Sequence, residues 1–362
     1  MKNKYLFFFF IFLLTSCKSL VELTGRGLVD NKVTRNTKST YKQIKKIPKK
    51  GFYIGHQDTS AYGVEWSHDN NSNENSDIYR LTKKYPAIYG FDIGDLELGY
   101  SKNLDGVSFD LMRKLIKQAH ANGSLVTLSW HANNPLTNGN SWDKTPAVSS
   151  VLSSGEIHDK FDTWIERLAI FFKSLTWNGK SIPLIFRPYH EMSGSWFWWG
   201  NTNCSPEEYI QLWRETVNKL RDVHGVHNLI YVYSPDKITT SKQYLEFYPG
   251  DEYVDVLGID VYDGNLHPYF DKFLEPGLSV ITELSRLKNK PIALTETGLE
   301  RIPKPKWFTE KLLPAIENTP ISWVLFWRNH DKSHHYIPYP MHAAANDFIE
   351  FSNHPKTLFR DE

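Results

Sequence analysis

A short apolar run that ends in a histidine and a carboxylate is the chemically richest stretch of this sequence. The stretch Pro183–Gly200 begins with apolar residues, continues into His190 and Glu191, and then carries three tryptophans. Apolar residues bounded by a proline predict a buried strand, and polar groups gathered at a strand end predict a site. The alternative interpretation is that Glu191 is a solvated loop carboxylate and that the tryptophans belong to the core.

A second stretch repeats this order and supplies a second carboxylate. In Pro291–Gly298 a proline precedes an apolar strand, Glu296 stands at the end of that strand, and Gly298 turns the chain. Glycoside chemistry of the acid/base type requires two carboxyl groups, because one protonates the leaving oxygen while the other attacks or activates water. Glu191 and Glu296, at the ends of two separate buried strands, form such a pair.

The elements that must position this pair alternate between strands and helices. Apolar residues at helical spacing run from Phe109 to Ala119, and the capping box Ser205-Pro206-Glu207-Glu208 opens another helix. This alternation predicts an α/β fold in the form of a (β/α)8 TIM barrel, with an open doubly wound sheet as the alternative. The predicted strands are Gly51–Gln57, Ala87–Asp92, Leu125–His131, Ile182–His190, Asn228–Ser234, Val254–Tyr262, Pro291–Thr297 and Ile321–Asn329.

A barrel makes a further prediction about where the chemistry lies. Enzymes with this fold carry their active sites at the carboxyl ends of the strands. Polar and aromatic residues gather at those predicted ends, which favours an enzyme active site over a purely structural barrel. These residues are His56, Gln57, Asp92, Asp95, Trp130, His131, His190, Glu191, Asp260, Tyr262, Glu296 and the run Trp327–His330.

Several of these motifs resemble a known enzyme family. The chain from about Gly51 to its end is similar to glycoside hydrolase family 26, the retaining β-mannanases. A histidine rather than an asparagine before the acid/base glutamate makes the resemblance specific. It rests on His190-Glu191 at the fourth strand, Trp196 five residues later, Glu296 at the seventh strand, Trp130–Pro135 at the third and Phe326–Arg328 at the eighth.

The resemblance implies an activity and a role for each matched residue. Glu191 would be the general acid/base and Glu296 the nucleophile, with His190 and Tyr262 in contact with them. The implied activity is retaining hydrolysis of β-1,4-mannosidic bonds in mannan, galactomannan or manno-oligosaccharides. The positions that shape the sugar subsites are matched by His131, Trp142, Trp196, Asp260, Trp327 and Arg328.

Elementary chemistry supports these roles independently. A retaining enzyme needs its two carboxyl groups about 5–5.5 Å apart, and strands four and seven face each other across a barrel mouth. Tryptophans beside Glu191 disfavour its charged form, which suits an acid, whereas Tyr262 and Arg187 can hold Glu296 ionised. Metal catalysis is the rival interpretation, but the motif histidines lack the tight ligand spacing of a zinc site. We therefore expect neither a metal nor a cofactor.

Composition and charge limit the range of partners. The 362 residues are 40% apolar, 14% aromatic and 23% charged, which describes a globular protein with one barrel-sized domain. A net charge of +1 gives no reason to expect a nucleic acid or an anionic membrane surface as partner, and we expect a monomer. The many aromatic rings suit a carbohydrate cleft, although most of them, including Trp307 and Trp323, are expected in the core.

Two other functions stay open. The same barrel and the same glutamate pair could cut another β-linked glycan, such as a mixed-linkage glucan or a xylan. From a different class, the protein could be a non-catalytic glycan-binding lipoprotein. Binding alone needs no pair of strand-end glutamates beside a histidine, so the pair speaks against that second alternative.

The first residues predict export and a lipid anchor. Lys2 and Lys4 precede an apolar run that is too short to span a bilayer, and Cys17 closes a stretch that resembles the bacterial lipoprotein box. The alternative is an ordinary signal in which Cys17 is incidental. We expect a protein held at the bacterial cell envelope only by its lipid, facing the periplasm rather than the cell surface. Cys204 is the only other cysteine, which excludes an internal disulfide and Cys-based metal sites.

These features divide the chain into three predicted parts. Residues 1–16 are expected to be a lipoprotein signal peptide, residues 17–50 a lipid-anchored polar tether, and residues 51–362 the catalytic (β/α)8 domain. The tether is predicted because the segment from Asn31 to Lys50 has no acidic residue and is rich in Lys, Ser and Thr.

One long insertion bears on where the chain of a substrate would be cut. Nearly thirty residues separate His131 from the helix around Phe161, far more than a typical βα connection contains. Trp142 in this insertion offers a platform for a sugar ring. The loop could close the cleft beyond the second glycone subsite, so that mannobiose is released from chain ends. The alternative is a flexible loop over an open cleft that cuts internally.

Overall fold

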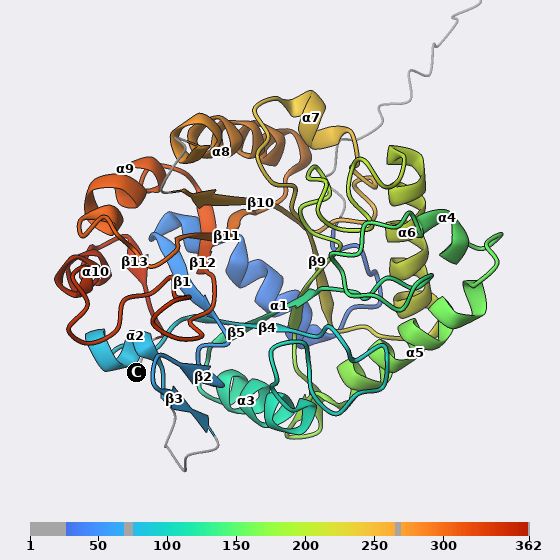
Figure 1. Ribbon diagram of the computed structural model, residues 1–362, viewed down its shortest axis with the longest axis horizontal. Helices are drawn as coiled ribbons and strands as arrows, with labels where there is room; N and C mark the ends of the chain where they lie inside the picture. The colour runs from blue at the N-terminus through green and yellow to red at the C-terminus, as the bar shows by residue number, and fades with distance from the viewer. Residues whose placement is uncertain (1–26, 69–74, 265–268, 361–362) are drawn as a thin grey trace, which may run out of the picture.

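Eight parallel strands close into a barrel, as the sequence predicted. The computed structural model describes residues 27–68, 75–264 and 269–360 (Figure 1). The strands pair in the order β12-β11-β10-β9-β8-β5-β4-β1, and β1 pairs with β12 to close the ring. Each strand overlaps a predicted segment: β1 Phe52–Gln57, β4 Ile88–Asp92, β5 Leu125–Trp130, β8 Leu184–Pro188, β9 Leu229–Tyr233, β10 Val256–Asp263, β11 Ile292–Leu299 and β12 Ile321–Phe326.

Helices surround the strands on the outside of the barrel (Figure 1). The predicted capping box is confirmed at the start of α6, where Ser205 and Glu208 bond reciprocally. Within the described part of the chain, no helix combines the length and apolar character that a bilayer crossing requires. The outer helices are α2 Asp77–Thr82, α3 Phe109–Ala121, α4 Val148–Val151, α5 His158–Ser174, α6 Pro206–Asn218, α7 Ser241–Leu245, α8 Tyr269–Lys288, α9 Leu313–Ile316 and α10 Ala345–Ser352, with the π-helical turns η3 Lys219–Val223 and η4 Phe308–Leu312.

Additional short strands lie in the loops and beside the start of β1. The hairpin of β6 (Thr176–Trp177) and β7 (Lys180–Ser181) precedes β8, and β13 (Thr357–Leu358) pairs with the start of β1. A further hairpin joins β2 (Tyr62–Gly63) to β3 (Trp66–Ser67) at the mouth side of β1.

The core lies between the strands and the helices and continues into the barrel interior. All residues of β4, β5, β8, β9, β11 and β12 are buried, as expected for parallel strands covered on both faces. Trp307 and Trp323 are each 1% exposed, which confirms the prediction that both belong to the core.

Residues 27–50 correct the predicted domain boundary. The prediction of a polar tether is wrong for this part of the chain, because α1 (Arg35–Ile44) and the short helix η1 (Ile47–Lys49) fold against the barrel. Residues 27–50 therefore belong to the same domain as the barrel. Cys17, the predicted signal peptide and residues 17–26 lie outside the described residues and stay predictions.

An apolar stripe on α1 explains this packing. Thr37, Tyr41 and Ile44 follow one another at spacings of four and three residues, and all three are buried. Tyr41, Ile44 and Ile47 pack against side chains from seven barrel strands and close the end where those strands begin. The hydroxyl of Ser322 donates a hydrogen bond to the carbonyl of Ile44 over 3.0 Å. Because the segment is rich in lysine, its overall composition gives no sign of this apolar stripe.

Replacing Ile44 by alanine tests whether α1 is part of the fold. Ile44 is fully buried in the barrel base, so Ile44→Ala should lower the free energy of unfolding by about 2–5 kcal/mol in urea titrations. The exposed neighbour Lys42 is the control, and Lys42→Ala should change the free energy of unfolding by less than about 0.5 kcal/mol. Equal stability of the Ile44→Ala variant and the unmodified protein would instead support the predicted tether.

Candidate active site

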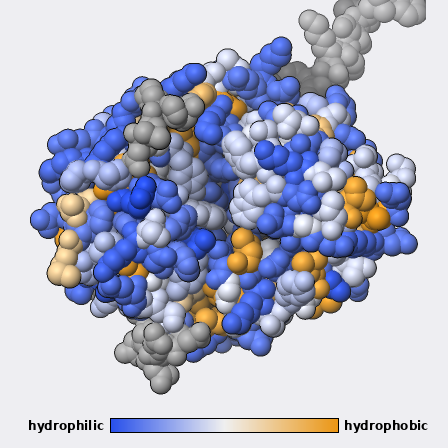
Figure 2. Space-filling model, viewed as in Figure 1, coloured by the Kyte–Doolittle hydropathy of each residue, from blue (hydrophilic) through white to orange (hydrophobic). Residues whose placement is uncertain are grey.

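A cleft of about 390 Å³ opens at the carboxyl ends of the strands, opposite the end that α1 closes. Figure 2 shows this face of the molecule, which is hollowed over the middle of the barrel. The position agrees with the rule that barrel enzymes carry their active sites at this end. The cleft is lined by His131, Trp142, His190, Glu191, Trp196, Phe197, Asp236, Lys237, Asp260, Tyr262, Glu296, Trp327 and Tyr336.

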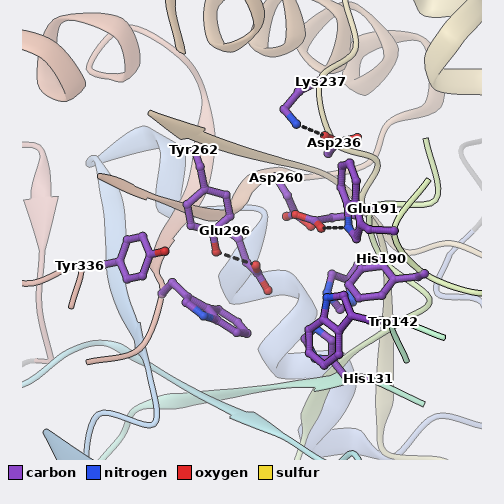
Figure 3. A pocket seen from close by; sticks show the side chains of 13 residues that line it. His131, Trp142, His190, Glu191, Asp236, Lys237, Asp260, Tyr262, Glu296 and Tyr336 are labelled. Carbon is purple, nitrogen blue, oxygen red and sulfur yellow. Dashed lines mark hydrogen bonds and ion pairs between the residues drawn. The ribbon is translucent and has the colours of Figure 1, made fainter. Parts of the chain in front are cut away.

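Glu191 lies in a tight turn directly after β8. Tyr189 and Glu191 adopt φ angles of 48° and 56°, in the left-handed region that residues other than glycine rarely occupy. The backbone N–H of Glu191 donates to the carbonyl of Ser234 over 2.8 Å, which ties the turn to the end of the next strand. The indole Nε1 of Trp196 donates to Oε2 of Glu191 over 2.8 Å (Figure 3). Backbone strain of this kind gathers at functional sites, and here it accompanies a carboxyl group that faces the cleft.

The surroundings of Glu191 favour the protonated form of its carboxyl group. Burial raises the pKa of Glu191 well above its ordinary value, and the negative charges of Asp260, Glu296 and Asp236 raise it further. The hydrogen bond from Trp196 acts in the opposite direction and is the weaker influence. A carboxyl group whose protonated form is favoured can donate its proton to a leaving oxygen, and the role of Glu191 as the acid stays a prediction.

Glu296 has the opposite surroundings. It lies in β11 and is buried, and its carboxylate accepts a hydrogen bond of 2.7 Å from the hydroxyl of Tyr262. Its other oxygen contacts the guanidinium of Arg187, which comes from β8. A cation and a hydroxyl donor together compensate the negative charge of this carboxylate. The two donors are those that the sequence predicted for Glu296.

The carboxyl groups are close enough for direct attack by one of them. One oxygen each of Glu191, Asp260 and Glu296 lies within 4.8 Å of the other two. Retaining glycosidases hold their two carboxyl groups about 5–5.5 Å apart, whereas inverting enzymes need about 6.5–9.5 Å to admit a water molecule. The spacing of Glu191 and Glu296 therefore fits the retaining geometry.

The same three carboxyl groups are also of the type that binds hard cations. Oxygen ligands suit Mg²⁺ and Ca²⁺, and three of them converge here. The guanidinium of Arg187 already pairs with Asp260 and Glu296, so the site supplies its own positive charge. The expectation of no metal stays a prediction.

Asp260 holds the guanidinium of Arg187 in place. Its Oδ2 accepts hydrogen bonds from Nη1 of Arg187 over 2.8 Å and from the hydroxyl of Ser234 over 3.1 Å, and Oδ1 accepts one of 2.5 Å from Thr295. Burial raises the pKa of Asp260 to about 7, and the Arg187 guanidinium opposes this rise. Asp260 thus fixes the cation that faces Glu296.

The pKa values of two histidines in the cleft are shifted in opposite directions. Burial disfavours the charged form of His131, but Asp92, whose Oδ2 lies 2.7 Å from Nδ1 of His131, outweighs burial and raises its pKa. Burial, Arg187 and His131 together lower the pKa of His190 well below its ordinary value. The two rings meet edge to face with their centroids 4.6 Å apart. His131 therefore holds a positive charge more readily than His190, which stays neutral.

Aromatic side chains form one wall of the cleft. Trp142 stacks on His131 with ring centroids 5.2 Å apart and an interplanar angle of 21°, and 48% of its surface stays exposed (Figure 3). Trp327 lies on another side of His131, at 6.0 Å. An exposed indole face such as that of Trp142 can stack on the apolar face of a sugar ring. Trp142 and Trp327 both line the cleft, and their predicted contact with a sugar stays a prediction.

Arg328 is the one predicted cleft residue that the structure places elsewhere. Its Nε pairs with Asp105 over 3.1 Å, and Nη1 donates to the hydroxyl of Tyr62 over 3.3 Å. These partners line a neighbouring hollow on the mouth side rather than the cleft itself. The physical reason is the half-buried ion pair with Asp105, which draws the guanidinium away from the glutamates. The predicted contact between Arg328 and a sugar is not tested by this geometry.

Glu97 holds the loop that carries His131. Glu97 lies beyond the end of β4, and its side chain is fully buried. It accepts hydrogen bonds from Nε1 of Trp130 over 3.0 Å and from the backbone N–H of Asn133 over 2.8 Å. Burial raises the pKa of Glu97 to about 7. These hydrogen bonds fix Trp130 and Asn133, which flank His131 in the sequence, and so they position the His131 ring.

Four cleft residues received no role from the sequence. Asp236 and Lys237 lie three and four positions after the end of β9, so their place near a strand end could have revealed them. Lys237 pairs with Asp236 over 3.1 Å and lies 4.9 Å above the Trp196 ring. Tyr336 lies in the long connection after β12 and gave no local signal. The fourth residue is Phe197.

Solved structures resemble this barrel along most of its length. A β-mannanase from Bacteroides ovatus superimposes with a TM-score of 0.87 at 45% identity and covers 91% of this chain and 96% of its own. A second neighbour, the endo-β-1,4-mannanase of Cellulomonas fimi, has a TM-score of 0.83 at 32% identity and covers 93% of this chain and 78% of its own.

Sequence comparison gives the same assignment. A mannan endo-1,4-β-mannosidase from Bifidobacterium adolescentis is 32% identical over 359 residues, which are 92% of this chain but 35% of that relative. The chain thus spans about a third of the length of that relative. The model of glycosyl hydrolase family 26 matches residues 29–313. With the fold, the paired glutamates and this match in agreement, the chain belongs to glycosyl hydrolase family 26.

Proposed function

We propose that this protein is a retaining β-mannanase that hydrolyses β-1,4-mannosidic bonds in mannan, galactomannan or manno-oligosaccharides. The observation that carries the proposal is the contrast between two close glutamates, one kept protonated and one paired with a cation. The Bifidobacterium relative is a mannan endo-1,4-β-mannosidase and the Bacteroides relative is a β-mannanase, which supports mannan as the substrate.

The first half of the reaction forms a bond between sugar and protein. An oxygen of Glu296 attacks the anomeric carbon while Glu191 transfers its proton to the glycosidic oxygen, and the aglycone leaves as an alcohol. The Tyr262 hydroxyl and Arg187 orient the attacking carboxylate. Loss of negative charge from Glu296 in this step removes one of the influences that raise the pKa of Glu191.

The second half returns the carboxylate. Glu191, now ionised, removes a proton from a water molecule that attacks the anomeric carbon, and Glu296 leaves with its electron pair. The sugar regains its original anomeric configuration after two inversions. Trp196 supports the ionised state of Glu191 in this step through its indole N–H.

Hydrolysis of another β-linked glycan is the alternative within enzymes. Mixed-linkage glucan and xylan are the substrates to compare with mannan under one set of conditions. Faster hydrolysis of either than of mannan would replace mannan in the proposal. A protein that binds these glycans without releasing any reducing sugar would instead be a glycan-binding lipoprotein.

The two glutamates should fail in different ways when they are removed. Glu296→Ala should lose about 10⁴-fold or more of the activity even on an aryl β-mannobioside with a good leaving group, because no covalent step remains. Glu191→Ala should lose about 10²–10⁴-fold on mannan, less on the aryl glycoside, and regain turnover with azide. Glu283, exposed on α8, is the matched control, and Glu283→Ala should retain full activity. Equal loss in both cleft variants without azide rescue would contradict the assignment.

The pKa of Glu191 should move in opposite directions in two further variants. Trp196→Phe removes a hydrogen bond that lowers this pKa, so the basic limb of the kcat/KM profile should move to higher pH. Asp236→Asn removes a negative charge that raises it, so the same limb should move to lower pH. Trp142→Phe, which leaves the contacts of Glu191 intact, should not move the limb. Shifts of the same sign in the first two variants would refute Glu191 as the acid.

We further propose that the loop after β5 bounds the glycone side of the cleft. The side-chain amide of Asn134 donates to the carbonyls of Asp143 and Thr145 over 3.0 and 2.8 Å, and Nζ of Lys160 donates to Asn138 over 2.7 Å. These bonds hold the loop in a defined shape that places Trp142 over His131. A bounded cleft reads chains from one end.

Early products from mannohexaose distinguish the two modes of cutting. A bounded cleft should release mannobiose as the dominant first product, and Trp142→Ala should reduce that dominance. Trp177, which is exposed on β6, is the matched control, and Trp177→Ala should leave the product pattern unchanged. An early spread of mannotriose and mannotetraose would restore an open cleft and internal cutting.

Attachment through Cys17 is a separate proposal. We propose that Cys17 carries a lipid that holds the protein at the bacterial cell envelope, facing the periplasm. The motif Leu14-Thr15-Ser16-Cys17 after a short apolar run supports it. Cys17→Ala should move the protein from washed membranes to the soluble fraction after a high-salt rinse. Unchanged membrane fractionation of that variant would refute the anchor.

A further inference from the structure

The base of the barrel carries a dense group of positive charges. The segment from Asn31 to Lys50 contains eight Lys and Arg residues and no acidic residue, whereas the whole chain has a net charge of only +1. The remainder of the chain is therefore net acidic, and the small total charge conceals a strong asymmetry. All eight of these cations are exposed.

The fold of α1 and η1 places these charges on one outer surface. Thr37, Tyr41 and Ile44 point into the barrel, so Lys38 and Lys42 on the same helix point outward. In Figure 1, α1 lies within the ring of strands, and its packing places it at the end opposite the cleft. We call the surface formed by Lys38, Lys42, Lys46, Lys49 and Lys50 the basic base.

A groove in the basic base joins ammonium groups to apolar side chains. Lys42, Lys46 and Lys50 line it together with Ile47, Leu358 and Phe359, and its volume is about 490 Å³. None of these three lysines is paired with a carboxylate in residues 27–68, 75–264 and 269–360. A groove lined by both ammonium groups and apolar side chains suits an amphiphile with an anionic headgroup.

Acidic groups at this end of the barrel are already engaged. Asp255 is buried and accepts hydrogen bonds from the backbone N–H groups of Val29 and Tyr231, at 2.7 and 2.9 Å. Asp30 is buried and pairs with His227 over 2.7 Å. Neither carboxylate is placed to neutralise the exposed lysines, so their charge faces solvent.

The chain also reaches the barrel from this side. Val29 and Asp30 contact residues that directly precede β10 and β9, which are at the base. Gly27 lies ten positions after Cys17, and ten residues span at most about 35 Å when fully extended. A lipid on Cys17 would therefore keep the basic base, rather than the cleft, next to the bilayer.

We propose that the basic base is a docking surface for an anionic phospholipid bilayer. The lysines bind the lipid phosphates, the barrel stands on its base, and the cleft opens away from the membrane toward polymeric substrate. A single lipid chain gives only reversible membrane binding, and a polybasic surface is the kind of second signal that makes attachment stable. This proposal depends neither on hydrolysis nor on the lipid itself, because the surface belongs to the folded barrel.

Vesicle binding by the unlipidated full chain tests the docking surface. Cys17→Ala protein is mixed with vesicles of phosphatidylglycerol and phosphatidylcholine, or of phosphatidylcholine alone, and the bound fraction is measured by sedimentation. We expect binding only to the anionic vesicles, and we expect added salt to abolish it. Adding Lys42→Glu, Lys46→Glu and Lys50→Glu should weaken binding about tenfold or more.

A matched charge reversal elsewhere separates the basic base from total charge. Lys114, Lys144 and Lys272 are exposed on the sides and mouth of the barrel, and changing all three to Glu alters the net charge equally. This control should keep most of the binding to anionic vesicles. All six lysines are exposed, so unchanged urea midpoints should show that both variants fold.

Three outcomes would overturn the proposal. Equal weakening in the two triple variants would show that only total charge matters. Equal binding to phosphatidylcholine alone would remove the role of lipid charge. Tighter binding to an RNA oligonucleotide than to the anionic vesicles would show that the basic base serves a nucleic acid instead.

Discussion

The guanidinium of Arg187 between two buried carboxylates is the interaction on which the site depends. It pairs with Asp260 and Glu296, while Glu191 brings a third carboxyl oxygen within 4.8 Å of both. One cation cannot compensate three negative charges at such distances in a buried site, so one group stays protonated. Glu191 is that group, since its partner is the neutral indole of Trp196. The contact with Arg187 thus distinguishes Glu296, the proposed nucleophile, from Glu191, the proposed acid.

Closure of the barrel brings Arg187 and its two carboxylate partners together at the mouth. The residues that stabilise the base lie at the other end of the strands. Arg187 comes from β8, whereas Asp260 and Glu296 come from β10 and β11, so only the ring of parallel strands brings the three together. At the opposite end, Tyr41 and Ile44 of α1 fill the barrel interior. Changes at the base therefore affect stability and surface charge, whereas changes at the mouth affect chemistry.

Much of the fold and most of the site follow from local patterns in the sequence. The strands were predictable because apolar runs bounded by prolines and glycines are local features, and Glu191 and Glu296 were predictable because each follows such a run. Asp236 and Tyr336 were missed for different reasons. Asp236 lies three positions after β9, which is a local signal, whereas the position of Tyr336 depends on how a long loop folds back onto Gly298. The tether prediction was wrong for residues 27–50, because the charged composition of this segment concealed the short apolar stripe of α1.

The stereochemistry of the first product tests the central claim, which is a double displacement by two close glutamates. Proton NMR of a fresh manno-oligosaccharide digest, recorded before the sugar mutarotates, identifies the anomer that the enzyme releases. The account predicts that the β anomer appears first, because attack by Glu296 and then by water inverts the anomeric carbon twice. Initial release of the α anomer would show a single displacement by water and would contradict the role of Glu296 as nucleophile.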